Sequence, residues 1–199
     1  MYKRQGEHNV LNALAAIAIA DKIGIGQQPI RDGLAGFEGI GRRFEILGEI
    51  AVQGGSAVLV DDYAHHPREI EATLGAAQGC WPERRRVVVF QPHRYTRLRD
   101  LFHEFADLLV GEACLIVTEV YAAGEAPIDG VHGRSLCEAI RSRGGKDPVF
   151  LGDVWALAAQ LDDVLLPGDV VLTLGAGDIG RVVRECLTFN RSVPEGGGE

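Results

Sequence analysis

The sequence predicts an α/β fold with a mostly parallel sheet and helices on both faces of that sheet. From residue 43 onward, short strand-like runs alternate with helical patterns, which is typical of parallel sheets. The run Arg86–Phe90 is β-branched and aromatic, as expected of a strand that is covered on both sides. Polar or glycine-rich segments follow several of these runs, at the edge where such sheets bind ligands.

Residues 1–41 predict two helices without strands of their own. Apolar residues recur at helical spacing up to Gly24, and Pro29, a favoured first-turn residue, begins a second helix that ends near Leu34. Glycines then form a flexible junction. We expect residues 1–41 to be an incomplete part of a preceding domain, with an exposed apolar patch.

The chain from residue 42 to 190 is expected to form one complete domain. Gly54-Gly55 indicates a hairpin between the first two strands, and the glycine-rich tail 191–199 is expected to be disordered. The strands are expected at 44–50, 57–60, 86–90, 114–118, 148–151 and 170–174, and the helices at 67–77, 98–109, 135–143, 154–161 and 179–187.

Composition narrows the class of protein. The net charge of −8 argues against a nucleic-acid surface and favours small-molecule partners. The four cysteines are widely spaced, which argues against a structural zinc site and a disulfide scaffold. There is no apolar run of the roughly 18 residues that a membrane span needs and no signal peptide, so we expect a cytoplasmic protein.

Basic residues follow the strand 86–90 directly. Pro92 ends the strand, and His93, Arg94 and Arg97 lie where the chain passes into a helix. Two guanidiniums beside an imidazole are suited to bind a carboxylate or a phosphate. A solvated helix start is the alternative, but helix N-termini favour acidic residues.

The segment Asp61-Asp62-Tyr63-Ala64-His65-His66-Pro67 follows the strand 57–60. Its carboxylates and imidazoles are possible metal ligands. Adjacent residues of an extended segment point to opposite sides, so the pairs would not converge on one ion, and we expect no metal site. We expect Asp62 to face one ligand group and Tyr63 with His65 to face another.

Glycines 175, 177 and 180 match the G-x-G-x-x-G pattern of dinucleotide-binding proteins. The pattern belongs in the first βαβ unit, whereas here it follows the last strand. A dinucleotide-dependent dehydrogenase is therefore the weaker interpretation. The glycines could instead let an anionic ligand approach the backbone, or pack the last helix on the sheet.

Two further pairs suit a nucleotide. Asn9 and Asn12 share a helix face, where amides could bind a base or a ribose. Arg42 and Arg43 follow the glycine junction, where a guanidinium could stack on a base or bind a phosphate. A helix cap at Asn9 and a solvated arginine pair remain alternatives.

Five motifs, in order and at similar spacing, resemble the Mur ligases, and most closely those that join L-alanine to UDP-N-acetylmuramate. The related murein peptide ligases share an Asp-Asp-x-Ala-His-His-Pro motif but lack the motif at residues 90–97. The five motifs are 8–16 (HNVLNALAA), 41–44 (GRRF), 61–67 (DDYAHHP), 90–97 (FQPHRYTR) and 120–125 (VYAAGE).

The resemblance implies a Rossmann-like C-terminal domain over 42–190 and places residues 1–41 at the end of a central ATP-binding domain. It implies that ATP and Mg²⁺ activate the muramoyl carboxylate as an acyl phosphate, which the amine of L-alanine attacks during peptidoglycan precursor synthesis. By motif, Asn9, Asn12, Arg43 and Asp62 correspond to nucleotide-binding residues. Those on the alanine and acyl-phosphate side are Tyr63, His65, His93, Arg94 and Arg97.

The sequence departs from the family in one respect. It contains no G-x-x-x-x-G-K-[ST] loop for the phosphates of ATP, and the resemblance assigns no metal ligand or catalytic residue to this chain. We therefore expect a C-terminal fragment that is inactive alone and lacks its N-terminal and central domains. The alternative is a stand-alone module that binds an amino acid or a nucleotide without catalysis.

Overall fold

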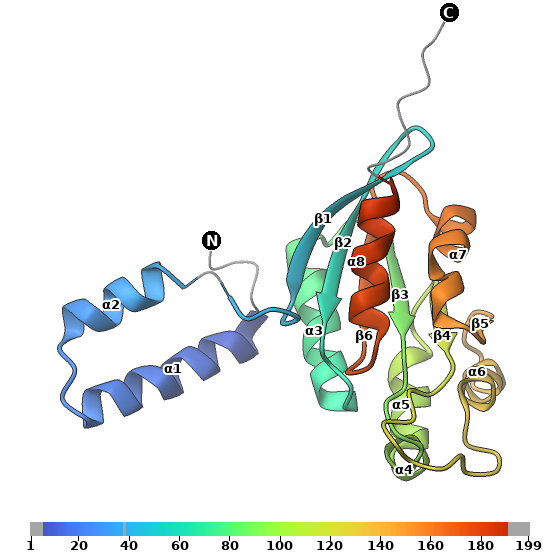
Figure 1. The fold of residues 1–199 in the computed structure, drawn as a ribbon, viewed down its shortest axis with the longest axis horizontal. Helices are drawn as coiled ribbons and strands as arrows, with labels where there is room; N and C mark the ends of the chain where they lie inside the picture. Colours follow the sequence, from blue (N-terminus) through green and yellow to red (C-terminus); the bar gives the residue numbers. More distant parts are fainter. Residues whose placement is uncertain (1–5, 38, 191–199) are drawn as a thin grey trace, which may run out of the picture.

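The fold is that of a computed structural model, which describes residues 6–37 and 39–190, with the side chains of residues 10–37 and 39–187 (Figure 1). The tail 191–199, which the sequence predicts to be disordered, lies outside the described residues.

The predicted mostly parallel sheet is confirmed. Its six strands lie in the order β1-β2-β6-β3-β4-β5. Only β1 at one edge is antiparallel to its neighbour β2, and the other neighbouring pairs are parallel. The strands are β1 (Glu45–Val52), β2 (Gly55–Asp62), β3 (Arg86–Phe90), β4 (Leu115–Thr118), β5 (Val149–Leu151) and β6 (Val170–Leu174).

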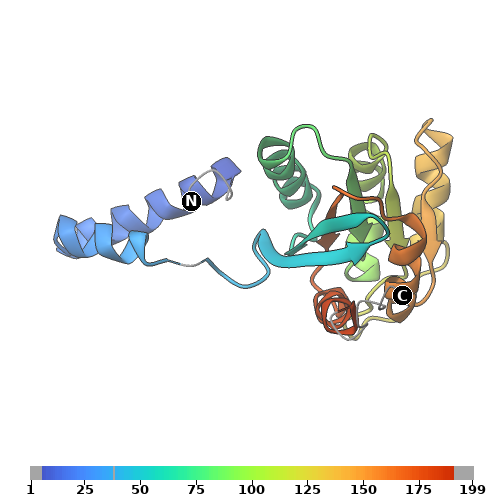
Figure 2. The same ribbon diagram turned by 90° about the horizontal axis from the view of Figure 1, so that it is seen from above.

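Helices cover both faces of the sheet and enclose two separate layers of core (Figure 2). Fully buried side chains such as Ile70, Phe105 and Leu136 fill the first layer, and Leu161 and Val183 fill the second. The first face carries α3 (Pro67–Cys80), α5 (Phe102–Leu109) and α6 (Gly133–Ser142), and the second carries α7 (Leu157–Val164) and α8 (Ile179–Asn190). A short 3₁₀ helix, η2 (Val154–Ala156), precedes α7.

Three elements differ from the sequence prediction. The helix predicted at 154–161 is the 3₁₀ helix η2 followed by α7, which begins at Leu157. Strand β2 continues to Asp62, because Asp61 and Asp62 pair in register with Thr173 and Leu174 of β6. The single helix predicted at 98–109 is two helices, α4 (Tyr95–Asp100) and α5, separated at Leu101. Apolar spacing could not reveal this break, because buried residues on both sides of it enter the same core layer.

The helices α1 (Gly6–Lys22) and α2 (Gln27–Ala35) extend to one side of the sheet domain, and α1 approaches that domain at α3 (Figures 1 and 2). They are the two predicted helices without strands of their own. Large apolar side chains in and after them are exposed, for example Leu11 at 60% and Ile23 at 69%. A cavity of about 650 Å³ lies between the helices.

Neither a membrane-spanning helix nor a reactive form of Cys137 or Cys186 is found in the described residues. None of the helices there is both long enough and apolar enough to cross a membrane. The four cysteines are free, and burial raises the pKa of Cys137 and of Cys186 to about 11. These two thiols are therefore protonated at neutral pH and behave as small core residues.

The start of α6 gives a test of this packing. A Cβ added at Gly133 would overlap the carbonyl oxygen of Thr118, and it would lie 2.9 Å from Cε2 of Phe150. A backbone oxygen in a central strand cannot move aside, so Gly133→Ala should lower the free energy of unfolding by more than about 2 kcal/mol. Urea denaturation would measure this.

The matched control is Gly75→Ala, at an exposed position of α3 where a Cβ meets nothing within 4 Å. It should raise the free energy of unfolding by about 1 kcal/mol through helix propensity. Equal effects of the two substitutions would contradict the packing at α6.

Candidate functional site

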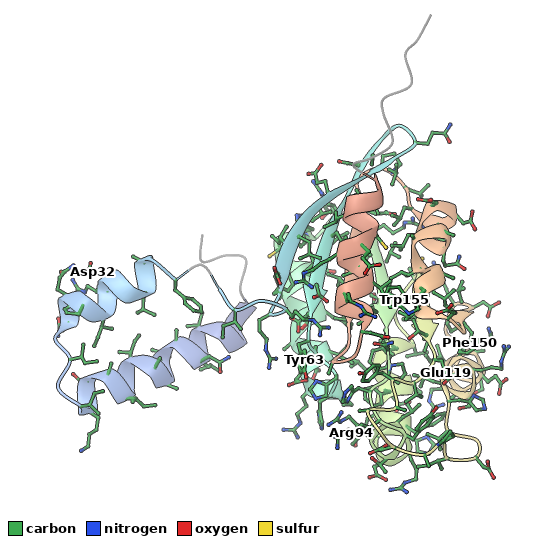
Figure 3. The ribbon with its side chains drawn as sticks, viewed as in Figure 1. Asp32, Tyr63, Arg94, Glu119, Phe150 and Trp155 are labelled. Atoms are coloured by element: carbon green, nitrogen blue, oxygen red, sulfur yellow. The ribbon has the colours of Figure 1, made fainter. Side chains whose placement is uncertain are left out.

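The polar segments predicted from the sequence meet at one edge of the sheet, where parallel strands β2, β3, β4 and β6 end. Figure 3 shows Tyr63, Arg94 and Glu119 at this edge. Each follows a different strand, so the fold brings together segments that are distant in sequence. This is the edge where ligands bind in open α/β sheets.

The basic group after β3 has a defined geometry. Nη1 of Arg97 lies 3.1 Å from Nδ1 of His93 and 3.1 Å from the His93 carbonyl oxygen. A guanidinium can only donate, so Nδ1 accepts and a neutral His93 carries its proton on Nε2. Arg94 is exposed beside them. The segment thus presents two guanidiniums and one N–H group, all donors, as an anion requires.

The surroundings of His93 keep its imidazole neutral. Burial lowers its pKa below the usual 6.5, and the charges of Arg97, His65 and Arg94 lower it further. The carboxylate of Glu125 acts in the opposite direction but does not reverse the shift. At neutral pH, His93 is therefore a hydrogen-bond donor through Nε2 and is uncharged.

A row of four rings lies beside the basic group. Ring centroids are 5.3 Å apart for Tyr63 and His65, 5.7 Å for His65 and His93, and 5.5 Å for His93 and Tyr121. Tyr63 and His65 therefore share a side, as their alternation predicted. The sequence analysis did not assign Tyr121 to the site. Its position in the polar segment after β4 was the available signal.

The second imidazole of the histidine pair has a different role. Nδ1 of His66 accepts from the backbone N–H of Arg68 at 3.3 Å and caps α3. Glu69 completes this capping box by accepting from the N–H groups of His65 and His66, at 3.0 and 3.2 Å. Burial raises the pKa of Glu69, but these bonds and the charges of His65 and Arg43 outweigh it, so the pKa is lowered.

Asp62 is buried inside the sheet domain, 3% exposed. Its two oxygens accept from the backbone N–H groups of Phe44 and Ala64, each at 2.8 Å. Burial raises the pKa of this carboxyl group in spite of these bonds. Its two backbone partners join the segment before β1 to the segment after β2, and the predicted nucleotide contact stays a prediction.

Arg42 lies in the sheet domain and not toward a ligand surface. Its Nε donates to Asp61 at 3.1 Å, and its Nη2 and Nη1 donate to the carbonyl oxygens of Gly175 and Gly177 at 2.5 and 3.3 Å. The guanidinium also lies 5.0 Å from the centre of the Tyr63 ring. The sequence analysis treated Arg42 and Arg43 as a pair, and the structure separates their roles.

The glycine pattern 175–180 accommodates protein side chains. A Cβ at Gly180 would overlap the guanidinium of Arg42, and one at Gly177 would overlap Gln91 and Tyr121. The backbone N–H of Ile179, at the start of α8, donates to Oε1 of Gln91 at 3.1 Å. The places that a dinucleotide phosphate would need are thus taken, which supports the packing interpretation over the dehydrogenase.

The predicted nucleotide-binding residues fall into two groups. Asn12 and Arg43 both line the cavity between α1 and α2, whereas Asp62 is enclosed in the sheet domain. Arg43 also lies 3.8 Å from Oε1 of Glu69. Asn9 belongs to α1, but its side chain falls outside the described part of the chain.

Comparison with known proteins decides the family. Residues 42–177 match the family described as "Mur ligase, glutamate ligase domain". The chain belongs to the Mur ligases. This confirms the resemblance that the five motifs indicate, and with it the predicted fold class, a Mur ligase C-terminal domain preceded by two helices.

This Mur ligase chain spans less than two fifths of the length of the two alanine ligases that it matches. A UDP-N-acetylmuramate--L-alanine ligase from Halorhodospira halophila is 56% identical over 175 residues, which are 88% of this chain and 36% of that protein. The crystal structure of the UDP-N-acetylmuramate-alanine ligase MurC from Thermotoga maritima is 33% identical, with a TM-score of 0.74, and the match covers 94% of this chain and 38% of that one. For a murein peptide ligase from Psychrobacter arcticus the identity is 24%, the TM-score 0.64 and the coverage 94% and 38%.

The state of His93 can be measured directly. An NMR titration of its imidazole should give a pKa below 6.5, because burial and Arg97 disfavour the charged form. Since the folded pKa lies below the unfolded one, protonation opposes folding. The contribution of His93 to stability is therefore present above pH 6.5 and is lost as the pH falls through its folded pKa.

Two arginine substitutions make that titration specific. Arg97→Gln should raise the pKa of His93, because it removes the charge that lies against Nδ1. Arg99→Gln, two residues further along α4 and paired with Asp100, should leave the pKa unchanged. An unshifted His93 pKa in the Arg97 variant would contradict the geometry described above.

Proposed function

We propose that this chain supplies the amino-acid-binding part of an ATP-dependent ligase that joins L-alanine to UDP-N-acetylmuramate through an acyl phosphate. The observation that carries the proposal is the group of donors at His93, Arg94 and Arg97, beside the rings of Tyr63 and His65. The higher identity to alanine-adding ligases than to the murein peptide ligase supports this substrate. The product belongs to peptidoglycan precursor synthesis in the bacterial cytoplasm.

The chemistry needs positioning and charge neutralisation more than proton transfer. The neutral amine of L-alanine attacks the acyl carbon, an amide bond forms, and phosphate leaves with the electrons of the broken C–O bond, while the proton that the amine loses passes to the phosphate or to water. Arg94 and Arg97 hold the alanine carboxylate and offset the charge of the departing phosphate. The neutral His93 adds an Nε2–H donor, and the ring row bounds the space beside it.

ATP is assigned to a different place, the cavity between α1 and α2, which the segment before β1 also lines. We infer that Asn12 and Arg43 contact it from the cavity between α1 and α2, together with Asn9, and that Asp62 lies near it. The ligase would also require Mg²⁺. The described residues contain no group of three or more possible metal ligands, and we assign no residue of this chain to the ion.

The chain alone is expected to lack the ligase activity, because it corresponds to 36% of the length of its Halorhodospira relative and has no phosphate-binding loop. Purified chain mixed with UDP-N-acetylmuramate, ATP, Mg²⁺ and L-alanine should release no alanine-dependent phosphate. Steady turnover would disprove this expectation. Saturable binding of L-alanine or ATP without turnover would agree with it, and it would equally suit a stand-alone binding module.

A chimera separates the ligase from the binding module. Residues of this chain would replace the matching segment of the Halorhodospira ligase, and alanine-dependent phosphate release should be retained. In that protein Arg97→Ala should raise the KM for alanine and lower kcat/KM. The loss of a charge-assisted pair should cost about 2 to 4 kcal/mol of transition-state stabilisation. Arg99→Ala is the matched control. Unchanged alanine kinetics in the Arg97 variant would remove Arg97 from the site.

A further inference from the structure

The helix that carries Arg97 is held at its start by a distant carboxylate. Oε2 of Glu125 accepts from the backbone N–H of Thr96 at 3.0 Å, and its Oε1 accepts from the Thr96 hydroxyl at 2.6 Å. Both oxygens of one side chain thus bind one residue of the first turn of α4. Glu125 lies 29 residues away in sequence, in the loop that follows β4.

This helix start lacks a local cap. Arg94 occupies the N-cap position without a side-chain cap bond, and the first turn contains no acidic residue. The basic residues of α4, Arg97 and Arg99, lie in its last turn, so they do not supply what its first turn lacks. Glu125 therefore supplies from another segment the acceptor and the negative charge that helix starts usually take from their own sequence.

The backbone before α4 also depends on the loop after β4. Arg94 has a φ of +71°, which is uncommon for a residue with a side chain. Its N–H donates to the carbonyl oxygen of Tyr121 at 2.9 Å, and the N–H of Tyr121 donates to the carbonyl oxygen of Pro92 at 2.8 Å. These two bonds clamp the segment that turns from β3 into α4.

The loop itself is shaped to present the carboxylate. Ala123 and Gly124 have φ values of +49° and +86°, and the N–H of Glu125 donates to the carbonyl oxygen of Ala122 at 3.0 Å. This tight turn directs Glu125 back toward α4. Its bonds to the hydroxyl and N–H of Thr96, together with the charge of Arg94, lower the pKa of Glu125, so it is ionised at neutral pH.

We propose that Glu125 is a positioning residue of the anion-binding group: by holding Thr96 it fixes the start of α4 and keeps Arg97 against His93. That the bound anion is the carboxylate of L-alanine rests on the proposed function. The positioning role itself does not, because it concerns contacts within the chain.

The titration of His93 distinguishes this role from a simple charge effect. The charged groups that face His93 are Arg97 from α4, Arg94 from the residue before α4, His65 from the loop after β2, and Glu125. Removal of the Glu125 charge alone would lower the pKa of His93. Displacement of Arg97 would raise it, because the main neighbouring positive charge would move away. The two explanations therefore predict opposite signs.

The experiment is an NMR titration of His93 in the full 199-residue chain and its variants. Thr96→Val removes the hydroxyl donor without a change of charge, and it should raise the pKa of His93. Glu125→Ala should also raise it, and adding Thr96→Val to that variant should have little further effect, since the two residues act as a pair. Thr96→Ser keeps the hydroxyl and should leave the pKa of His93 unchanged. The control is Glu138→Gln, at an exposed acid on α6, which should also leave that pKa unchanged.

Binding of L-alanine and of inorganic phosphate to the same proteins completes the test. Glu125→Ala should weaken the binding of whichever anion the chain binds by about tenfold, whereas Glu138→Gln should not change it. A fall of the His93 pKa in Glu125→Ala, or no change in Thr96→Val, would overturn the positioning role. The expected His93 shifts in a chain that binds neither compound would support positioning and count against the proposed function.

Discussion

The sheet edge depends on one buried carboxylate. Asp61 is completely buried and accepts from Nε of Arg42 at 3.1 Å, from Nη1 of Arg184 at 2.9 Å and from the hydroxyl of Thr173 at 3.2 Å. An unpartnered buried charge would be strongly destabilising, so these contacts constrain one another. They connect the segment before β1 with β2, β6 and α8, and they hold Arg42 over the ring of Tyr63, which begins the row that leads to His93.

This constraint affects the two crevices beside β6. Strands β2 and β3 are followed by helices on one face of the sheet and β6 by a helix on the other, which creates crevices that usually receive ligands. Arg42 occupies the crevice between β2 and β6, and the amide of Gln91 occupies the crevice between β6 and β3. The polar side chains that the sequence predicts for the site lie farther out, near the starts of α3 and α4. The backbone N–H of Ile179, at the start of α8, is already bonded to Gln91.

The sequence predicted features that depend on local periodicity. It placed the strands, put Tyr63 and His65 on one side, and located the basic group after β3. It did not separate Arg42 from Arg43, because the positive φ of Arg42 that redirects the chain has no sequence signal in a residue other than glycine. It also missed the bond between Glu125 and Thr96 and the packing of Tyr121 on His93, since both join segments far apart in sequence. The break at Leu101 escaped because apolar spacing continues through it.

The reversed direction of β1 has a topological consequence. Glu45, at the beginning of β1, pairs with Asp61, near the end of β2, so the chain enters the sheet domain at the edge that carries His93, Arg94 and Arg97. Had β1 run parallel to β2, the incoming chain would arrive at the opposite pole, far from that group. A single hairpin at Gly54-Gly55 therefore places the entry of the chain and the carboxyl ends of the parallel strands at the same edge of the sheet.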